Sequence, residues 1–328
     1  LYYCGVFLQV HLRAVREDLR PYGDDMPTLW GTVRMGWPFL IPIGIIIGVL
    51  MAGYSPVFTA GAGAAAVVGA AMLTARTRMT LWRIVEALAE TTLRILPVAG
   101  ACAAAGLVIG GLSMTGLGMK AANVIIEVSG GAAFATLIIA AIVTIILGLG
   151  MPTPSAYILA AVLVGPALIE VGFPMLASHM FLLYFAILSA LTPPIAVAAL
   201  AAAAIAQEDP FRIAFSAVRL AVVGFLMPFV FIWNPAIIGQ GDPVQIAMIA
   251  VGGMAAAAAI AVAVEWVRPA GNVLGWGQRV MLLAGAVAAV APDPMVAAIG
   301  IVGTCAFLAV LYARSRNEPG KSQAEGGA

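Results

Sequence analysis

Long apolar runs follow one another along most of this chain, separated by short polar connections. They cover residues 35–54, 56–75, 95–113, 132–150, 155–171, 177–206, 213–238, 244–264, 279–291 and 294–313. A transmembrane helix needs about 20 apolar residues. Only 9% of the 328 residues are charged, whereas a soluble domain carries about 25%. The sequence therefore predicts an all-α integral membrane protein with many helices, which places the lipid bilayer among its partners.

The composition also excludes several classes of function. The formal net charge of +1 says nothing about nucleic acid, but the sequence has no basic patch with interleaved aromatic residues that would indicate nucleic-acid binding. The cysteines Cys4, Cys102 and Cys305 are too far apart in sequence to indicate a disulfide or metal set. With His11 and His179 as the only histidines, and no HExxH or GxSxG motif, we expect neither an enzyme nor a bound cofactor. His179 is interpreted as a hydrogen-bonded structural histidine rather than a proton relay.

Positive charge is distributed unequally between the two ends of the apolar runs. If residues 132–171 enter and leave the membrane as a unit, all of the 16 Lys and Arg residues except Lys120 fall on one side. Positively charged loops remain in the cytoplasm, so that side and the C-terminus are predicted to be cytoplasmic. This count requires an even number of crossings within 132–171. Two full spans and a re-entrant hairpin satisfy it equally.

Residues 81–94 differ from the apolar runs because they carry a polar stripe at helical spacing. The stripe consists of Arg83, Glu86, Glu90 and Arg94. We expect a separate helix along the cytoplasmic interface here, followed by a span at 95–113. Glu90 precedes Arg94 by one turn, which favours an ion pair between them. Residues 114–129 are expected to form a second, shorter surface helix.

Two Thr-Pro segments interrupt the apolar runs at membrane depth. Residues 148–155 read GLGMPTPS, and residues 189–194 read SALTPP. Within hydrocarbon, non-helical backbone persists only where it is buried in protein or lines a cavity. Proline is favoured at the first helical position and threonine can cap it, so we expect Thr153 and Thr192 to be N-caps of new half-helices. A simple proline kink is the alternative explanation for each segment.

Such breaks have a definite electrostatic polarity. An ending half-helix offers carbonyl groups to a cation such as Na⁺, and a starting half-helix offers N–H groups to a carboxylate. Transporters with broken helices place such ends at the bilayer midplane. The predicted ion and substrate site comprises Gly148, Gly150, Pro152, Thr153, Ser155, Ala190, Thr192, Pro193 and Pro194. Within it, Na⁺ is assigned to Gly150, Thr153 and Thr192.

Several segments, taken in order, resemble the large permease of TRAP transporters, in particular the fused type that works with a TAXI-class periplasmic binding protein. They are residues 147–157 (LGLGMPTPSAY), 179–181 (HMF), 184–185 (YF), 191–195 (LTPPI), 113–120 (SMTGLGMK), 209–212 (DPFR) and 219–228. The similarity covers roughly residues 80–236, and the spans at 244–313 look like the tail of the fused type.

The resemblance implies a fold of two inverted repeats, each with a re-entrant hairpin and a broken helix. On that template, 132–171 is the second hairpin and 177–206 the second broken helix. It also implies Na⁺-coupled uptake of organic acids through elevator-like movement, across the bacterial inner membrane. The partners would be a periplasmic substrate-binding protein and a small permease subunit, or a fused upstream region in place of that subunit.

The expected organisation has four parts. They are the end of a preceding helix with a cytoplasmic loop (1–34), a membrane repeat (35–238), additional C-terminal transmembrane helices (239–313) and a disordered cytoplasmic tail (314–328). We find one hairpin-and-break unit, so its counterpart from the first repeat is expected to precede Leu1.

Two other functions fit the same residues. One is a proton-coupled or uncoupled permease of similar fold. The other is a non-transporting membrane scaffold for a binding protein. No acidic residue lies at mid-membrane depth in any apolar run, which argues against a carboxylate proton relay.

Overall fold

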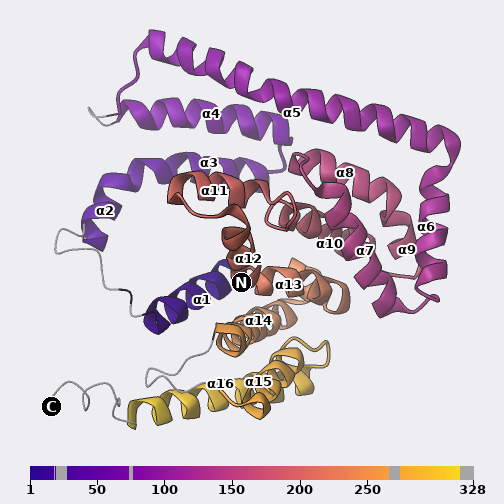
Figure 1. Ribbon diagram of the computed structural model, residues 1–328. Coiled ribbons are helices and arrows are strands. Elements are labelled where there is room, and N and C mark those ends of the chain that lie inside the picture. Colours follow the sequence, from indigo (N-terminus) through magenta and orange to yellow (C-terminus); the bar gives the residue numbers. More distant parts are fainter. Residues whose placement is uncertain (18, 20–27, 74–76, 266–273, 318–328) are drawn as a thin grey trace. The chain divides into compact units, whose positions relative to one another are not determined.

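The computed structural model describes residues 1–17, 19, 28–73, 77–265 and 274–317 (Figure 1). These residues form helices and loops, with no strand among them, which confirms the all-α prediction. The chain divides into two compact units: Leu1–Leu19 together with Ala101–Ala328, and Arg20–Gly100. Helix α5, Leu81–Thr115, runs through the boundary between the units.

The smaller unit holds two apolar helices that pack against each other. Its elements before α5 are α2 (Leu29–Gly36), the 3-10 helix η1 (Trp37–Phe39), α3 (Leu40–Met51) and α4 (Pro56–Met72). The hydroxyl oxygens of Thr28 and Ser55 accept hydrogen bonds that cap α2 and α4. Helices α3 and α4 come close where Gly63 faces Ile46, because a Cβ added at Gly63 would lie 2.8 Å from that side chain. A small residue therefore sets the distance between them.

The larger unit contains the remaining helices. They are α1 (Tyr2–Arg16), α6 (Leu117–Val128), α7 (Ala133–Gly148), α8 (Thr153–Leu163), α9 (Gly165–Glu170), α10 (Met175–Leu188), α11 (Val197–Ala206), α12 (Pro210–Leu220), α13 (Val222–Trp233), the 3-10 helix η2 (Pro235–Ile238), α14 (Pro243–Glu265), α15 (Trp276–Ala289) and α16 (Pro294–Asn317). Helix α16 thus continues to Asn317, within the segment expected to be a tail, and residues 318–328 lie outside the described part of the chain.

Four helical segments of the described chain are long and apolar enough to cross a bilayer. They are Leu29–Met51, Leu81–Thr115, Pro243–Glu265 and Pro294–Ala313. Helices α12 and α13 form a fifth if they count as one span, although they bend by 42° at Ala221. The fold is therefore that of a multi-pass membrane protein.

The separate interfacial helix expected at 81–94 is wrong, because these residues and 95–113 form the single helix α5. The change from polar to apolar composition alters what the helix faces but does not end the helix. Pro97 lies inside α5 and does not end it. The expected ion pair is confirmed: an Arg94 guanidinium nitrogen lies 2.6 Å from a Glu90 carboxylate oxygen, and both side chains are exposed.

The core of the larger unit is an aromatic cluster between α7, α10 and α13. Phe181 and Leu182 on α10 are fully buried, and so is Leu137 on α7. The ring of Phe229 on α13 meets that of Phe181 edge to face, with 5.4 Å between the ring centroids, and also contacts Phe185. Because α10 packs against both α7 and α13, it is the central helix of this unit.

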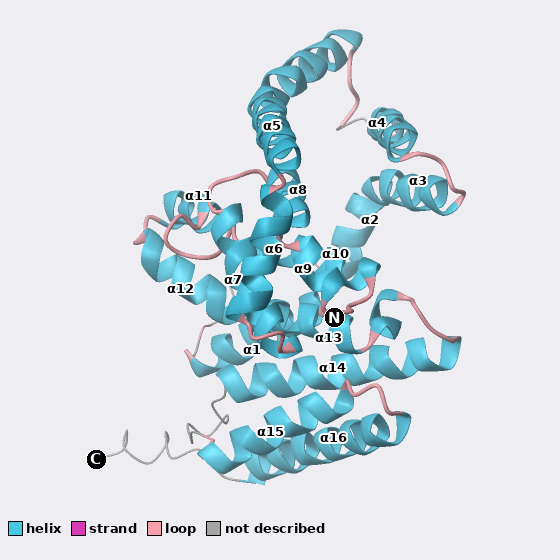
Figure 2. Ribbon diagram, turned by 90° about the vertical axis from the view of Figure 1, so that its right-hand side faces the viewer, coloured by secondary structure: helices cyan, strands magenta, loops and turns pink. Residues whose placement is uncertain are grey.

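Helices α14, α15 and α16 lie side by side in both views (Figures 1 and 2). Their glycines face neighbouring backbone at close range. A Cβ added at Gly252 would overlap the carbonyl oxygen of Ala289, and one added at Gly300 would overlap the backbone of Ala288 and Ala289. Such small-residue packing is how helices associate in lipid, where the hydrophobic effect gives no drive between them.

A polar contact joins three helices that are far apart in sequence. The Nε atom of Arg219 on α12 lies 2.7 Å from a carboxylate oxygen of Glu265 on α14, and its Nη2 atom donates to the carbonyl oxygen of Val264 at 3.0 Å. Gln9 on α1 donates through Nε2 to the carbonyl oxygen of Arg219 at 3.2 Å. Glu265 is 1% exposed and Arg219 44% exposed.

We expect Glu265→Ala to lower the free energy of unfolding by about 1–3 kcal/mol. The Arg219 guanidinium would lose its carboxylate partner and keep only its hydrogen bond to the carbonyl oxygen of Val264. The matched control is Glu90→Ala, which removes the exposed pair on α5 and should cost below about 0.5 kcal/mol. Denaturant unfolding of the purified protein in detergent, with Arg219→Ala to complete a double-mutant cycle, measures both. Equal losses for the two glutamate variants would contradict this assignment.

Candidate functional site

The first break separates α7 from α8 and depends on a glycine. Helix α7 ends at Gly148, Leu149 is extended, and Gly150 has φ +74°. The N–H of Met151 donates to the carbonyl oxygen of Gly148 at 3.2 Å, which closes the turn. An L side chain at the left-handed conformation of Gly150 would be strained, so a glycine there permits the turn.

The second break separates α10 from α11 and spans residues 189–196. Its backbone groups pair partly with one another: the N–H of Thr192 donates to Ser189 and the N–H of Ala196 donates to Thr192. The N–H of Ala198 reaches back to the carbonyl oxygen of Ala190 at 3.1 Å. The Pro193–Pro194 peptide bond is cis. The break is thus an ordered non-helical turn with internal hydrogen bonds.

The predicted threonine caps are wrong at both breaks. Thr153 is already the first residue of α8, its N-cap is Pro152, and no side chain caps that end. Thr192 instead donates its hydroxyl to the carbonyl oxygen of Leu188 at 2.9 Å, which ties it to the preceding helix. Helix α11 starts only at Val197, because a proline disfavours helical backbone in the residue before it and two prolines follow Thr192.

The structure brings the two breaks together. Gly148 faces Ser189, and a Cβ added at Gly148 would lie 2.8 Å from the Cβ of Ser189. A Cβ added at Gly150 would lie 3.3 Å from the Cδ1 atom of Ile195. Helix α10 packs against both α7 and α8 (Figure 1). The paired glycines of the first break therefore permit close approach of the second.

The remaining predicted residues occupy different surroundings. Pro152, Thr153, Ala190, Thr192 and Pro193 are half-buried within the breaks, whereas Pro194 is exposed. Ser155 is fully buried, and its hydroxyl lies 3.5 Å from the Sγ atom of Cys102 on α5, within hydrogen-bonding range for sulfur. The hydroxyl of Ser155 therefore points to α5, while its backbone stays in the first turn of α8.

Two residues that sequence reasoning missed belong with this site. Ser189, on the second break, is 1% exposed and donates its hydroxyl to the carbonyl oxygen of Ala186 at 2.7 Å. Thr144 is fully buried one helical turn before Gly148, and its hydroxyl has no hydrogen-bond partner among the described residues. The i, i+4 spacing of Thr144 and Gly148 on one helical face was the available signal.

The electrostatics of the site come from backbone rather than from charged side chains. Neither break contains an ionisable residue. Helix α7 ends at the first break with its carbonyl groups, and α8 begins there with N–H groups that no side chain caps. The described residues contain no cluster of His, Cys, Asp and Glu for a transition metal. The arrangement suits a hard monovalent cation at carbonyl and hydroxyl oxygens, and an anion at N–H groups.

His179 has the structural role that was expected of it. Its Nδ1 atom lies 2.9 Å from the hydroxyl oxygen of Tyr157, which links α10 to α8. The two rings also meet edge to face. This pair ties α8, which follows the first break, to α10, which precedes the second break.

A multi-pass helical membrane protein with two adjoining helix breaks belongs to the class of membrane transporters with discontinuous helices. Comparison with family models identifies the family. Residues 1–246 match the model described as "Tripartite ATP-independent periplasmic transporter, DctM component". The chain therefore belongs to this family of TRAP transporter permeases, whose partner is a periplasmic binding protein. Searches of curated proteins and of solved structures gave no match.

We expect Gly148→Ala to destabilise the protein by about 1–3 kcal/mol, because the new methyl group would overlap Ser189. The double variant Gly148→Ala with Ser189→Gly should recover part of that loss, since it removes the opposing side chain. Gly111→Ala on α5 is the control, because a Cβ there meets nothing within 4 Å. Unfolding in detergent measures all the variants. Strictly additive effects would show that the two breaks do not touch.

Proposed function

We propose that this chain is the permease of a Na⁺-coupled, binding-protein-dependent transporter that imports organic acids across the bacterial inner membrane. The observation that carries the proposal is the close approach of two uncharged helix breaks, at Gly148 and Ser189. Two such breaks together place ends of several half-helices in one region. A single proline kink would not.

The cation would bind at the carbonyl end of α7 and at the second break. Gly150 lets the backbone approach an ion closely, and the hydroxyl groups of Thr153 and Thr192 add oxygen ligands. Thr144 supplies a further buried hydroxyl on the same helical face as Gly148. Oxygen ligands without a negative side chain suit Na⁺ better than a divalent cation, which would require carboxylates to balance its charge.

The substrate carboxylate would bind at the N-terminus of α8. No side chain caps this end, and Pro154 has no N–H, so the N–H groups of Thr153 and Ser155 are the ones available to a ligand in the first turn. The helix dipole adds partial positive charge at the same place. Binding of Na⁺ and of the carboxylate at one break offsets their charges, which gives a physical reason for coupled transport.

The arrangement in the membrane follows from charge and from family membership. We propose that the C-terminus is cytoplasmic, as the distribution of Lys and Arg indicates. The hairpin of α7 with α8 and α9 would then be re-entrant from the periplasm and move as part of an elevator-like transport domain. We also propose that the permease is of the fused type that works with a TAXI-class binding protein. A small permease subunit, or a fused upstream region in its place, would complete it.

The test is uptake by the full transporter that contains this chain, reconstituted in liposomes with its binding protein and a panel of labelled carboxylates. We expect uptake to require a Na⁺ gradient. Thr153→Ala and Thr192→Ala should raise the Na⁺ concentration for half-maximal uptake about tenfold, the loss of about 1.4 kcal/mol for one oxygen ligand. Thr91→Ala on α5, whose hydroxyl bonds to its own helix, is the control.

Three outcomes would overturn parts of this function. Undiminished uptake with K⁺ in place of Na⁺ indicates a proton-coupled or uncoupled permease. Binding of the loaded binding protein without uptake indicates a non-transporting scaffold. Normal Na⁺ dependence in both threonine variants removes them from the ion site.

A further inference from the structure

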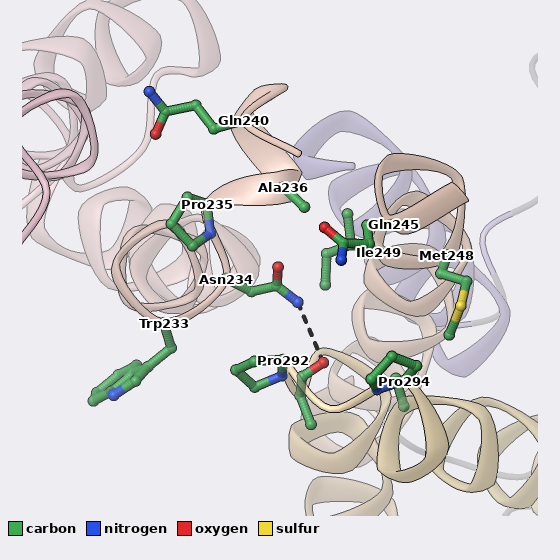
Figure 3. Close-up of a pocket in the computed structure, with 12 residues that line it drawn as sticks. Trp233, Asn234, Pro235, Ala236, Gln240, Gln245, Met248, Ile249, Pro292 and Pro294 are labelled. Carbon is green, nitrogen blue, oxygen red and sulfur yellow. Dashed lines mark hydrogen bonds between the residues drawn. The ribbon is translucent and has the colours of Figure 1, made fainter. Parts of the chain in front are cut away.

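Two cavities adjoin at the junction between α13 and the C-terminal helices. The first, of about 210 Å³, lies where α13, η2, α14 and α16 have their ends (Figure 3). The second, of about 540 Å³, lies between α13, α14 and α15. Trp233, Ala291 and Pro292 line both, so the two cavities adjoin at these residues. The family match ends at residue 246, so most of α14 and all of α15 and α16 lie outside it.

The two cavities differ in chemistry. The larger one is lined by aliphatic and aromatic side chains, including Leu226, Ile260 and Leu283. The smaller one holds the carboxamides of Asn234 and Gln245, which Figure 3 shows turned toward a shared space. Asn234 donates through Nδ2 to the carbonyl oxygen of Ala291 at 3.2 Å, so its own carbonyl oxygen serves as an acceptor. The polarity thus changes from apolar in the larger cavity to amide in the smaller cavity beside it.

This change follows the depth of a bilayer leaflet. Trp233 ends α13 and is 44% exposed, as is typical of aromatic residues at the membrane interface. From Trp233 back to Leu226 the helix covers about 10 Å, at about 1.5 Å per residue. The hydrocarbon of one leaflet is about 15 Å deep. The amide cavity therefore lies at interface level and the apolar groove extends into the hydrocarbon of the same leaflet.

Charge at the polar end is negative. Asp242 and Asp293, both exposed, directly precede α14 and α16 and cap them through their Oδ1 atoms. The described residues that line the two cavities include no lysine or arginine. Neither aspartate lines a cavity, but Asp293 stands between the lining residues Pro292 and Pro294, and Asp242 stands three residues before Gln245. An anionic headgroup would find no cation in the lining, whereas an ammonium group at this end would be attracted by the two nearby carboxylates.

We propose that this groove binds one glycerophospholipid with a zwitterionic, amine-bearing headgroup. An acyl chain occupies the apolar groove, the ester region contacts Asn234 and Gln245, and the amine faces Asp242 and Asp293. The lipid joins the family-type helix α13 to the C-terminal helices. The proposal does not depend on Na⁺ coupling or on the nature of the transported substrate.

The first experiment fills the groove from its open side. Val287 lines the mouth and is 72% exposed, so Val287→Trp places an indole in the groove without disturbing a buried residue. Val302→Trp on α16, at a residue that is 68% exposed and does not line the groove, is the control. The full chain is purified from membranes, washed with detergent and analysed by native mass spectrometry. We expect phosphatidylethanolamine on the wild type and the control, and at least about fivefold less on Val287→Trp.

The second experiment tests the headgroup. Wild-type protein is exchanged into micelles with equimolar phosphatidylethanolamine and phosphatidylglycerol, and we expect phosphatidylethanolamine to be retained about fivefold in excess. The double variant Asp242→Asn with Asp293→Asn keeps both helix caps, because asparagine also caps, and should retain the two lipids equally.

Several results would overturn the proposal. One is equal lipid retention by wild type and Val287→Trp. Another is a wild type that retains no lipid, or retains phosphatidylglycerol at least as well. A wild-type dimer that becomes monomeric in Val287→Trp would show that a second copy of the chain covers the groove instead.

Discussion

A backbone group without a hydrogen-bond partner costs several kcal/mol in hydrocarbon, and the two breaks in this chain require that cost to be offset. The second break offsets part of it internally, through the bonds of Thr192 to Ser189 and Ala196 to Thr192. The rest depends on burial of each break against protein. Helix α10 provides this burial because it packs on α7 and α8 and brings Ser189 against Gly148. The aromatic cluster with α13 then holds α10 in place.

The positions of the breaks could be predicted from the sequence, but their local geometry could not. Glycine and proline act on their own residue and on the residue before it, so an interruption at Gly148–Pro154 or at Pro193 is a local property. The choice of cap is not local in that sense. Pro152 takes the N-cap position that was predicted for Thr153, and the two prolines delay α11 to Val197. The contact between Gly148 and Ser189 is a tertiary contact, and it cannot be predicted from the type of either residue.

The long-range polar contacts could not be predicted from the periodicity of the sequence. Gln9 and Arg219 are 210 residues apart, and Arg219 and Val264 are 45 residues apart. Periodicity identifies a helical face but not the helix that covers it. Helix α5 shows that composition can also mislead. Its amphipathic start and its apolar end differ in composition, so the sequence predicted two helices, but Pro97 between them does not end the helix and the backbone forms one.

The C-terminal helices need a source of association that lipid does not provide. Apolar side chains gain little by leaving acyl chains for each other, so helices in a membrane associate through close packing of small residues and through polar contacts. Both occur here. Gly252 and Gly300 let α14, α15 and α16 approach within backbone contact. Toward the helices of the family match, Arg219 pairs with Glu265, and Asn234 donates to the carbonyl oxygen of Ala291. At the other end of α14, the amide cavity around Asn234 leaves the junction with α13 only partly filled by protein. The junction thus has a salt bridge at one end of α14 and, at the other end, a single amide side chain beside two adjoining cavities. A bound lipid would fill these cavities and stabilise that end.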